Sequence, residues 1–149
     1  MMRQRIARFE RIYRTYEAEL DQRRSELARR REEEEAFRRR IRQLEEDRSR
    51  AEEDFRSLCG TVSARDLWMM RSSIDSAEDR VRSASEDLER CLCEIERTVE
   101  AIRESHRGLK VLENYMGRLR SRLSAEESAA EQALLDEIAL RRNGVGGAA

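Results

Sequence analysis

The sequence has no proline and no long apolar run, and each absence excludes a class of protein. Proline breaks helix interiors, so 149 residues without one leave long uninterrupted helices open. No stretch reaches the roughly 18 apolar residues that a membrane-spanning helix needs. The first residues also lack the apolar run of about 7–15 residues that a secretory signal requires. We therefore expect a protein of the cytoplasm.

Side chains suited to catalysis or metal binding are few. There are three cysteines, an odd number, and Cys91 and Cys93 are two residues apart, so they point to different faces of a helix. This spacing does not suit a shared zinc ion, and His106 is the only histidine. No glycine-rich phosphate loop, nucleophile elbow or HExxH motif occurs. The sequence predicts a protein that is not an enzyme and binds no metal and no cofactor.

Net charge is also nearly absent, although 42% of the residues are charged. The chain has 31 basic and 32 acidic residues, and Lys110 is its only lysine. A nucleic-acid-binding surface needs a basic excess that this balance does not supply, so we expect no nucleic-acid partner. Arginine runs at 29–31 and 38–40 are separated by the acidic run 32–35, which favours ion pairs along an exposed helix.

Apolar residues recur at alternating spacings of three and four along most of the chain, as they do in coiled coils. We call these positions the apolar ladder. Its first part is Ile6, Phe9, Tyr13, Tyr16, Leu20, Arg23, Leu27, Arg30, Glu34, Phe37, Ile41, Leu44, Arg48, Ala51, Phe55 and Leu58. Its second part is Leu67, Met70, Ile74, Ala77, Val81, Ala84, Leu88, Cys91, Ile95, Thr98, Ile102, Ser105, Leu109, Leu112, Met116, Leu119 and Leu123. The ladder predicts two long helices.

A short segment between the two parts of the ladder predicts a reversal of the chain. Gly60 follows the first part, where a helix end favours glycine in the left-handed conformation. Ser63 and Asp66 are spaced like a capping box at the start of a helix. We therefore expect an all-α fold, an antiparallel coiled-coil hairpin whose second helix is the longer. The expected boundaries are helix 3–58, turn 59–63 and helix 64–142 within one domain, 1–142, followed by a flexible tail, 143–149.

The two parts of the ladder pair throughout when Leu58 faces Leu67. This register places Phe9 against Met116, and it leaves the second helix unpartnered after about residue 123. In a parallel dimer, each charged ladder residue would face the same residue of the other chain, and the like charges would repel. In the hairpin it faces an uncharged residue, and a long arginine side chain can extend past that residue to solvent. The charged ladder residues are Arg23, Arg30, Glu34 and Arg48. We therefore expect a monomeric hairpin.

The two ends of the expected hairpin differ in chemistry. Residues 1–16 contain five arginines and one acidic residue, Glu10, and the register places them near Arg118, Arg120 and Arg122. At the turn, Trp68 and Met69 lie off the ladder, and tryptophan is enriched in binding hot spots. The alternative is that Trp68 folds over the loop as a cap. Two distinct ends are typical of a protein that connects two partners.

A segment near the C-terminus carries a family resemblance. Residues 135–139 read LDEIA and are followed by Arg141, which resembles the ending of the FliJ/YscO family. The aromatic Trp68 soon after the turn is similar to aromatics in that family, whose members are central stalk proteins of flagellar and virulence-associated type III secretion. The resemblance implies a non-enzymatic connector that couples a hexameric export ATPase to an export gate and engages export chaperones. It also implies a cytoplasmic location, peripheral to the bacterial inner membrane.

The resemblance also implies a role for each end of the hairpin. The end with both termini would enter the ATPase, and the turn would reach the gate. The implied ATPase contacts are Arg3, Arg5, Arg8, Arg11, Asp136, Glu137 and Arg141, and the implied gate contacts are Trp68 and Met69. Two other functions fit the same pattern: a structural coiled-coil spacer or scaffold with no ATPase partner, and a chaperone or adaptor for a secreted protein.

Overall fold

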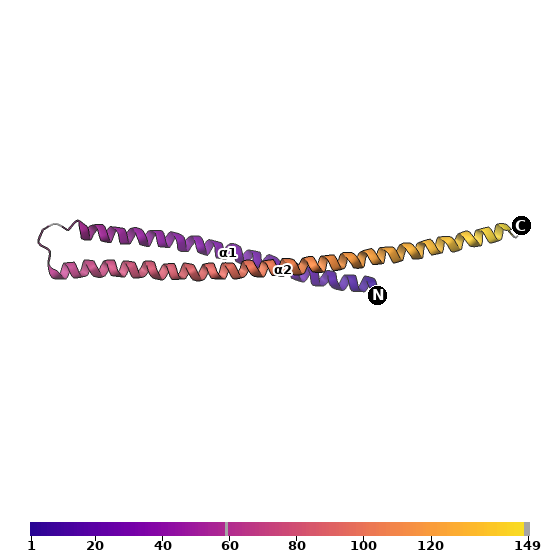
Figure 1. The fold of residues 1–149 in the computed structure, drawn as a ribbon, viewed down its shortest axis with the longest axis horizontal. Coiled ribbons are helices and arrows are strands. Elements are labelled where there is room, and N and C mark those ends of the chain that lie inside the picture. The colour runs from indigo at the N-terminus through magenta and orange to yellow at the C-terminus, as the bar shows by residue number, and fades with distance from the viewer. Residues whose placement is uncertain (59, 148–149) are drawn as a thin grey trace. The chain divides into compact units, whose positions relative to one another are not determined.

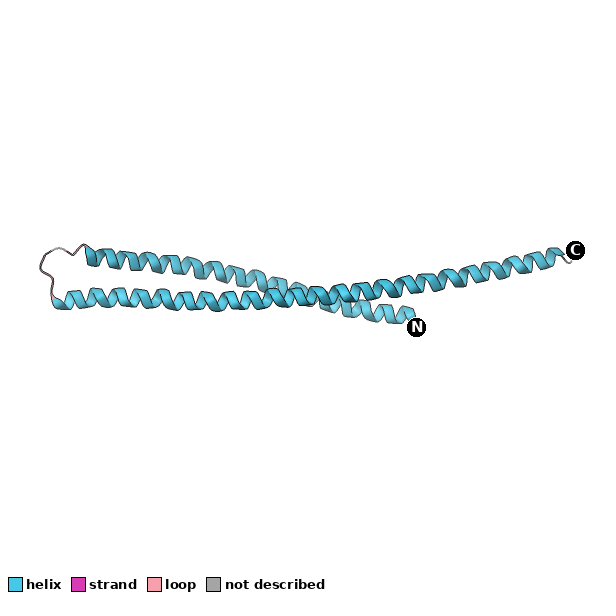
Figure 2. Cartoon of the chain, viewed as in Figure 1, coloured by secondary structure: helices cyan, strands magenta, loops and turns pink. Residues whose placement is uncertain are grey.

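The computed structural model describes residues 1–58 and 60–147 and confirms the all-helical fold. Helix α1 spans Met2–Arg56 and helix α2 spans Ala64–Gly147 (Figure 1). The two helices pack against each other as a helical hairpin, and the second is the longer (Figure 2). No helix in the described part of the chain has an apolar stretch long enough to cross a membrane.

The turn has the local features that its residues predict. Helix α1 ends at Arg56, and Gly60 follows with a φ of 96°, the left-handed region that glycine adopts without strain. The backbone N–H of Asp66 donates to the Ser63 hydroxyl oxygen at 3.1 Å, so Ser63 caps the start of α2. Cys59, which the sequence places in this loop, lies outside the described residues.

The C-terminal boundary of α2 differs from the one expected from sequence. The asparagine and glycines after residue 142 disfavour helix, but α2 continues to Gly147. Extending an existing helix avoids the entropic cost of nucleation, and each added residue gains one backbone hydrogen bond. Helical geometry therefore extends five residues past the expected end, and residues 148–149 are outside the described part.

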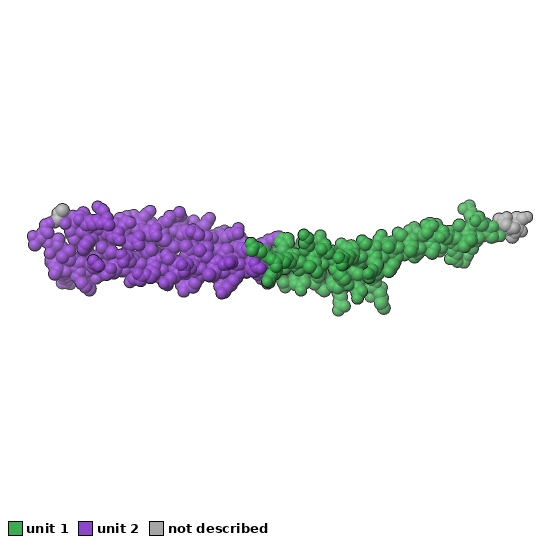
Figure 3. Space-filling model, in the orientation of Figure 1, with its two compact units in different colours: residues 1–21, 103–149 green, residues 22–102 purple. Residues whose placement is uncertain are grey.

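The chain divides into two compact units, shown in different colours in Figure 3. The termini unit consists of residues 1–21 and 103–149, and the turn unit consists of residues 22–102. Each unit contains one stretch of α1 and one of α2.

Among the described residues, the buried side chains all belong to the apolar ladder. Those of the termini unit are Ile6, Leu20, Leu109, Met116 and Leu119, and those of the turn unit are Ala84, Cys91 and Thr98. The hydroxyl of Thr98 donates to the carbonyl of Glu94 at 2.9 Å, so its polar group is satisfied. Most other ladder residues are half-buried, because two helices cannot surround a side chain on every side. Each unit therefore has a narrow core between its two helical stretches.

Contacts in the turn unit agree with the expected register. The guanidinium of Arg30 lies 3.1 Å from a carboxylate oxygen of Glu26 on α1 and 3.5 Å from one of Glu94 on α2. The thiol of Cys91 donates to the carbonyl of Arg30 at 3.6 Å. Arg30 therefore contacts Glu94, the residue next to Ile95, which is the partner expected for Arg30. The positive charge of Arg30 also offsets the repulsion between the two carboxylates.

The termini unit has the same pairing. The rings of Phe9 and Tyr115 meet edge to face, with centroids 5.0 Å apart and an interplanar angle of 74°. Such aromatic pairs are favourable beyond the area that they bury. Tyr115 is adjacent to Met116, the partner expected for Phe9, so the register is correct to within one residue here too.

Candidate partner-binding surfaces

One edge of the termini unit is closed by ion pairs between the helices. Arg3 of α1 pairs with Glu127 of α2 and donates to its carboxylate through Nε at 3.1 Å. One heptad further along, Glu10 pairs with Arg120 at 2.7 Å. We call the edge formed by these four residues the ion-paired edge. Both pairs are open to solvent, so they contribute little to the stability of the fold. They do show which residues of the two helices lie side by side.

The same edge contains a shallow hollow of about 330 Å³. Its lining residues are Glu10, Tyr13, Arg14, Glu17, Glu113, Met116 and Arg120. Carboxylates and cations alternate along it, so no single sign of charge dominates. The hydrogen bond and charge of Glu127 also raise the pKa of the nearby Arg3 guanidinium, because both favour its charged form.

Arg5, Arg8 and Arg11 are the arginines of the expected ATPase contact that have no ion pair within the described residues. All three are exposed. Arg3 is different, because Glu127 neutralises it from the other helix. A partner that approaches the N-terminal turns of α1 therefore meets three free guanidinium groups.

The C-terminal part of the expected contact is arranged along α2 alone. Arg141 pairs with Glu137 one turn earlier at 3.0 Å, and Asp136 accepts a hydrogen bond from the side-chain amide of Gln132 at 3.1 Å. The structure does not bring these residues into contact with the N-terminal arginines. The ladder loosens after Leu123, and large apolar side chains there are exposed rather than packed. They are Leu134, Leu135, Ile138 and Leu140.

Exposed apolar side chains also occur on the paired helices of the termini unit, and the sequence analysis missed them. Val111 is 69% exposed and Tyr115 is 39% exposed on α2, and Ile12 and Tyr16 are exposed on α1. Tyr16 is a ladder residue, so the sequence predicted it to be packed. The available signal was the spacing of four that places Val111 beside Tyr115 on one side of α2, off the ladder.

In the turn unit, the first turn of α2 presents Trp68 and Met69 to solvent. Trp68 is 69% exposed, so its indole does not lie buried over the loop, and Met69 is exposed beside it. Leu67, which the ladder predicts to pack against Leu58, is 40% exposed. The three consecutive side chains point to different sides of α2, so apolar groups are exposed around the helix close to the turn.

The two described cysteines, Cys91 and Cys93, differ in burial. Cys91 is buried and Cys93 is exposed. Burial, together with the carboxylates of Glu33 and Glu34, raises the pKa of the Cys91 thiol because it disfavours the thiolate. Among the described residues, no three histidine, cysteine, aspartate or glutamate side chains are grouped to hold a metal ion.

The family model of the flagellar FliJ protein matches residues 4–146, which include both helices and the turn. The chain belongs to the flagellar FliJ family. This confirms the resemblance drawn from the C-terminal segment and Trp68. A FliJ family protein is a component of a type III export apparatus, and the family is structural and non-catalytic. No curated protein and no solved structure matched the chain.

Proposed function

We propose that this FliJ family protein is the stalk that couples the hexameric export ATPase to the export gate of a flagellar type III apparatus. The observation that carries the proposal is the family match over both helices, joined to two chemically different exposed surfaces. One surface is the arginine group of the termini unit, which consists of Arg5, Arg8 and Arg11. The other consists of Trp68 and Met69 in the turn unit. The protein acts by binding and not by catalysis.

The termini unit is the part that we assign to the ATPase. Arg5, Arg8 and Arg11 lie within two turns of α1, exposed and without an ion pair among the described residues. Free arginines steer association with an acidic or polar surface, and each forms paired hydrogen bonds with a carboxylate on contact. Asp136, Glu137 and Arg141 add charges of both signs further along α2.

The turn unit is the part that we assign to the gate. Trp68 and Met69 expose a large aromatic ring and a flexible thioether beside each other at the start of α2. Side chains of these types anchor protein interfaces by filling apolar pockets. We place the working protein in the cytoplasm, peripheral to the inner membrane when it is assembled, with export chaperones as further partners.

The test is charge reversal of the arginine group. The variant with Arg5→Glu, Arg8→Glu and Arg11→Glu should no longer stimulate the cognate export ATPase, because three attractive contacts become repulsive. Its far-ultraviolet circular dichroism should match that of the wild type, since all three side chains are exposed. Full stimulation by this variant, with unchanged salt dependence, would contradict the assignment.

The spacer function is tested in the same assay. If no hexameric ATPase binds the wild-type protein, the stalk function is wrong and a structural coiled-coil spacer takes its place. The exposed apolar residues after Leu123 favour the adaptor function instead, because an unpartnered Leu134 and Ile138 one turn apart suit a helix of a secreted protein. Capture of export substrates in the absence of the ATPase would support that function.

A further inference from the structure

The two edges of the termini unit differ in how their charges are neutralised. On the ion-paired edge, Arg3 of α1 pairs with Glu127 of α2, and Glu10 of α1 pairs with Arg120 of α2. The opposite edge has arginines as well, but they have no such partners within the described residues. The unit therefore has one neutralised edge and one that keeps its positive charge.

Helical spacing identifies the residues of the charged edge. On α2, Val111, Tyr115, Arg118 and Arg122 follow one another at intervals of four, three and four, so they share one side of the helix. On α1, Arg5 and Arg8 lie on one side, three residues apart. The ring contact between Phe9 and Tyr115 places these two sides next to each other. We call this surface the arginine–tyrosine face: Arg5, Arg8, Val111, Tyr115, Arg118 and Arg122.

The arginine–tyrosine face is open and basic, and its two uncharged side chains adjoin the arginines at one end. All four arginines are exposed, and Tyr115 and Val111 continue the same side of α2 from Arg118. Over residues 5–16 and 108–122 the same side carries no carboxylate, whereas Glu126, one turn after Arg122, lines a hollow together with Arg5. Four arginines without an ion pair among the described residues are thus exposed near a tyrosine, on a chain whose net charge is only −1.

We propose that the arginine–tyrosine face is the docking surface for an acidic segment with apolar side chains on the export ATPase, and that the ion-paired edge does not contact that segment. This inference rests on the proposed function and adds which side of the hairpin binds. Arginine and tyrosine are the residues that protein interfaces favour, and arginine holds carboxylates through two parallel hydrogen bonds. The edge-to-face contact with Phe9 orders the Tyr115 ring before binding, which lowers the entropic cost.

A one-sided contact has a consequence for the ATPase. The hairpin has no rotational symmetry, so it cannot present the same face to every subunit of a ring at once. A single basic face pairs with the acidic segment of one subunit, or of two neighbours, while the ion-paired edge faces the others. The stalk therefore makes otherwise identical subunits different from one another.

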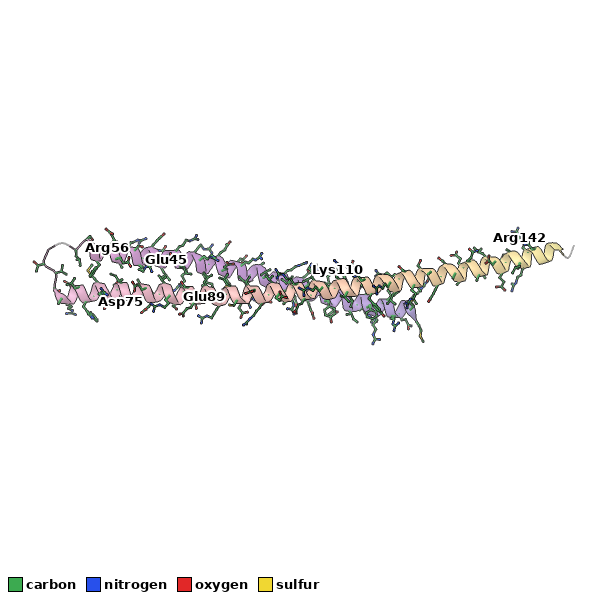
Figure 4. All side chains as sticks on the ribbon, viewed as in Figure 1. Glu45, Arg56, Asp75, Glu89, Lys110 and Arg142 are labelled. Atoms are coloured by element: carbon green, nitrogen blue, oxygen red, sulfur yellow. The ribbon has the colours of Figure 1, made fainter. Side chains whose placement is uncertain are left out.

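The test compares two full-length variants that change the charge equally. The face variant carries Arg118→Glu and Arg122→Glu. The control variant carries Arg14→Glu and Lys110→Glu: Arg14 lines the hollow of the ion-paired edge, and Lys110 is exposed one turn before Glu113 of that hollow. Lys110 is labelled among the charged side chains in Figure 4. The probe is the cognate export ATPase, titrated at two salt concentrations, and circular dichroism verifies that each variant is folded.

We expect the face variant to bind the ATPase at least about tenfold more weakly and to lose salt dependence, whereas the control stays within about twofold of the wild type. Tyr115→Ala should weaken binding with little change in salt dependence. If the face variant loses helicity, the pair Arg118→Gln and Arg122→Gln replaces it, with the same direction of effect expected.

Each other outcome overturns the inference in a recognisable way. Equal weakening by the face and control variants would mean that the charge of the unit acts as a whole, which leaves the proposed function standing. Loss of binding to phosphatidylglycerol vesicles by the face variant, with unchanged ATPase binding, would identify the face as a membrane contact. A wild-type protein that does not bind the ATPase would contradict both proposals.

Discussion

At the scale of single residues, burial determines which cysteine thiols are accessible. Cys91 is a ladder residue enclosed between the helices, with its thiol donating to the carbonyl of Arg30. Cys93, two residues later, points to another side of α2 and is exposed. The spacing of the two cysteines was enough to predict this difference from the sequence. It was not enough to predict that the thiol of Cys91 would find a backbone partner on the other helix.

The Cys91 thiol should make stability depend on pH above neutrality. Burial raises its pKa, so the folded state holds the thiol proton more tightly than the unfolded chain does. The resulting stabilisation is complete below the unfolded thiol pKa of about 8.5 and is lost as pH rises toward the folded value. The melting temperature of the wild type should therefore fall more than that of Cys91→Ala between about pH 7 and pH 10.

A matched control is available at the neighbouring cysteine. Cys93→Ala should keep the pH dependence of the wild type, because it leaves Cys91 in place and removes only an exposed side chain. In the folded protein, iodoacetamide should modify Cys93 and leave Cys91 intact until unfolding, as peptide mapping by mass spectrometry would report. Parallel melting curves for the wild type and Cys91→Ala across the pH range would show that the thiol does not contribute.

At the scale of the helices, the sequence predicted which residues lie on the side facing the other helix, because this depends on periodicity. It did not predict how much of each side chain is exposed. Spacing alone placed every buried residue of the described part of the chain on the ladder, and Gly60 and Ser63 indicated the turn. Leu67 and Tyr16 are also ladder residues, but they are exposed, since only two helices are present to cover the seam. Periodicity gives the side of a helix on which a residue lies, whereas the area covered depends on how closely the partner helix approaches.

This difference predicts unequal effects for two aromatic residues. Phe37 is a half-buried ladder residue of the turn unit, and replacing a buried phenylalanine by alanine typically costs about 3–5 kcal/mol. In this thin core we expect Phe37→Ala to lower the free energy of unfolding by about 3 kcal/mol, the lower end of that range. Trp68→Ala should change it by no more than about 0.5 kcal/mol, because the indole is mostly exposed.

Urea denaturation followed by circular dichroism measures both changes on one scale. The slope of unfolding free energy against urea should stay the same in the two variants, which shows that the comparison concerns stability and not the extent of unfolding. A loss for Trp68→Ala as large as that for Phe37→Ala would mean that the indole caps the turn, and that its role is structural.

At the scale of the whole molecule, the proposed function depends on two different exposed surfaces of one chain. The sequence predicted the family, now confirmed by the match over residues 4–146, because the hairpin pattern of the whole chain and the short C-terminal segment can both be read from it. It also drew attention to Trp68 by its position off the ladder, and to the N-terminal arginines by their local excess of charge. It did not distinguish Arg3 from Arg5 and Arg8, since the pairing of Arg3 with Glu127 depends on residues that are more than a hundred positions apart.

The two surfaces should be separable by mutation. Trp68→Ala removes the largest exposed side chain of the turn unit, whereas Arg5, Arg8 and Arg11 belong to the termini unit and keep their exposure. We therefore expect Trp68→Ala to stimulate the purified export ATPase as well as the wild type does, while secretion of flagellar subunits in cells falls severalfold. Immunoblots of the culture supernatant measure secretion, and the cellular level of the variant is compared in the same samples.

Trp68→Phe provides the control, because an aromatic ring that still fills an apolar pocket should retain most of the secretion. A variant that loses ATPase stimulation and secretion together, at normal cellular levels, would show that the turn surface serves the ATPase, and the division of labour between the two surfaces would be wrong.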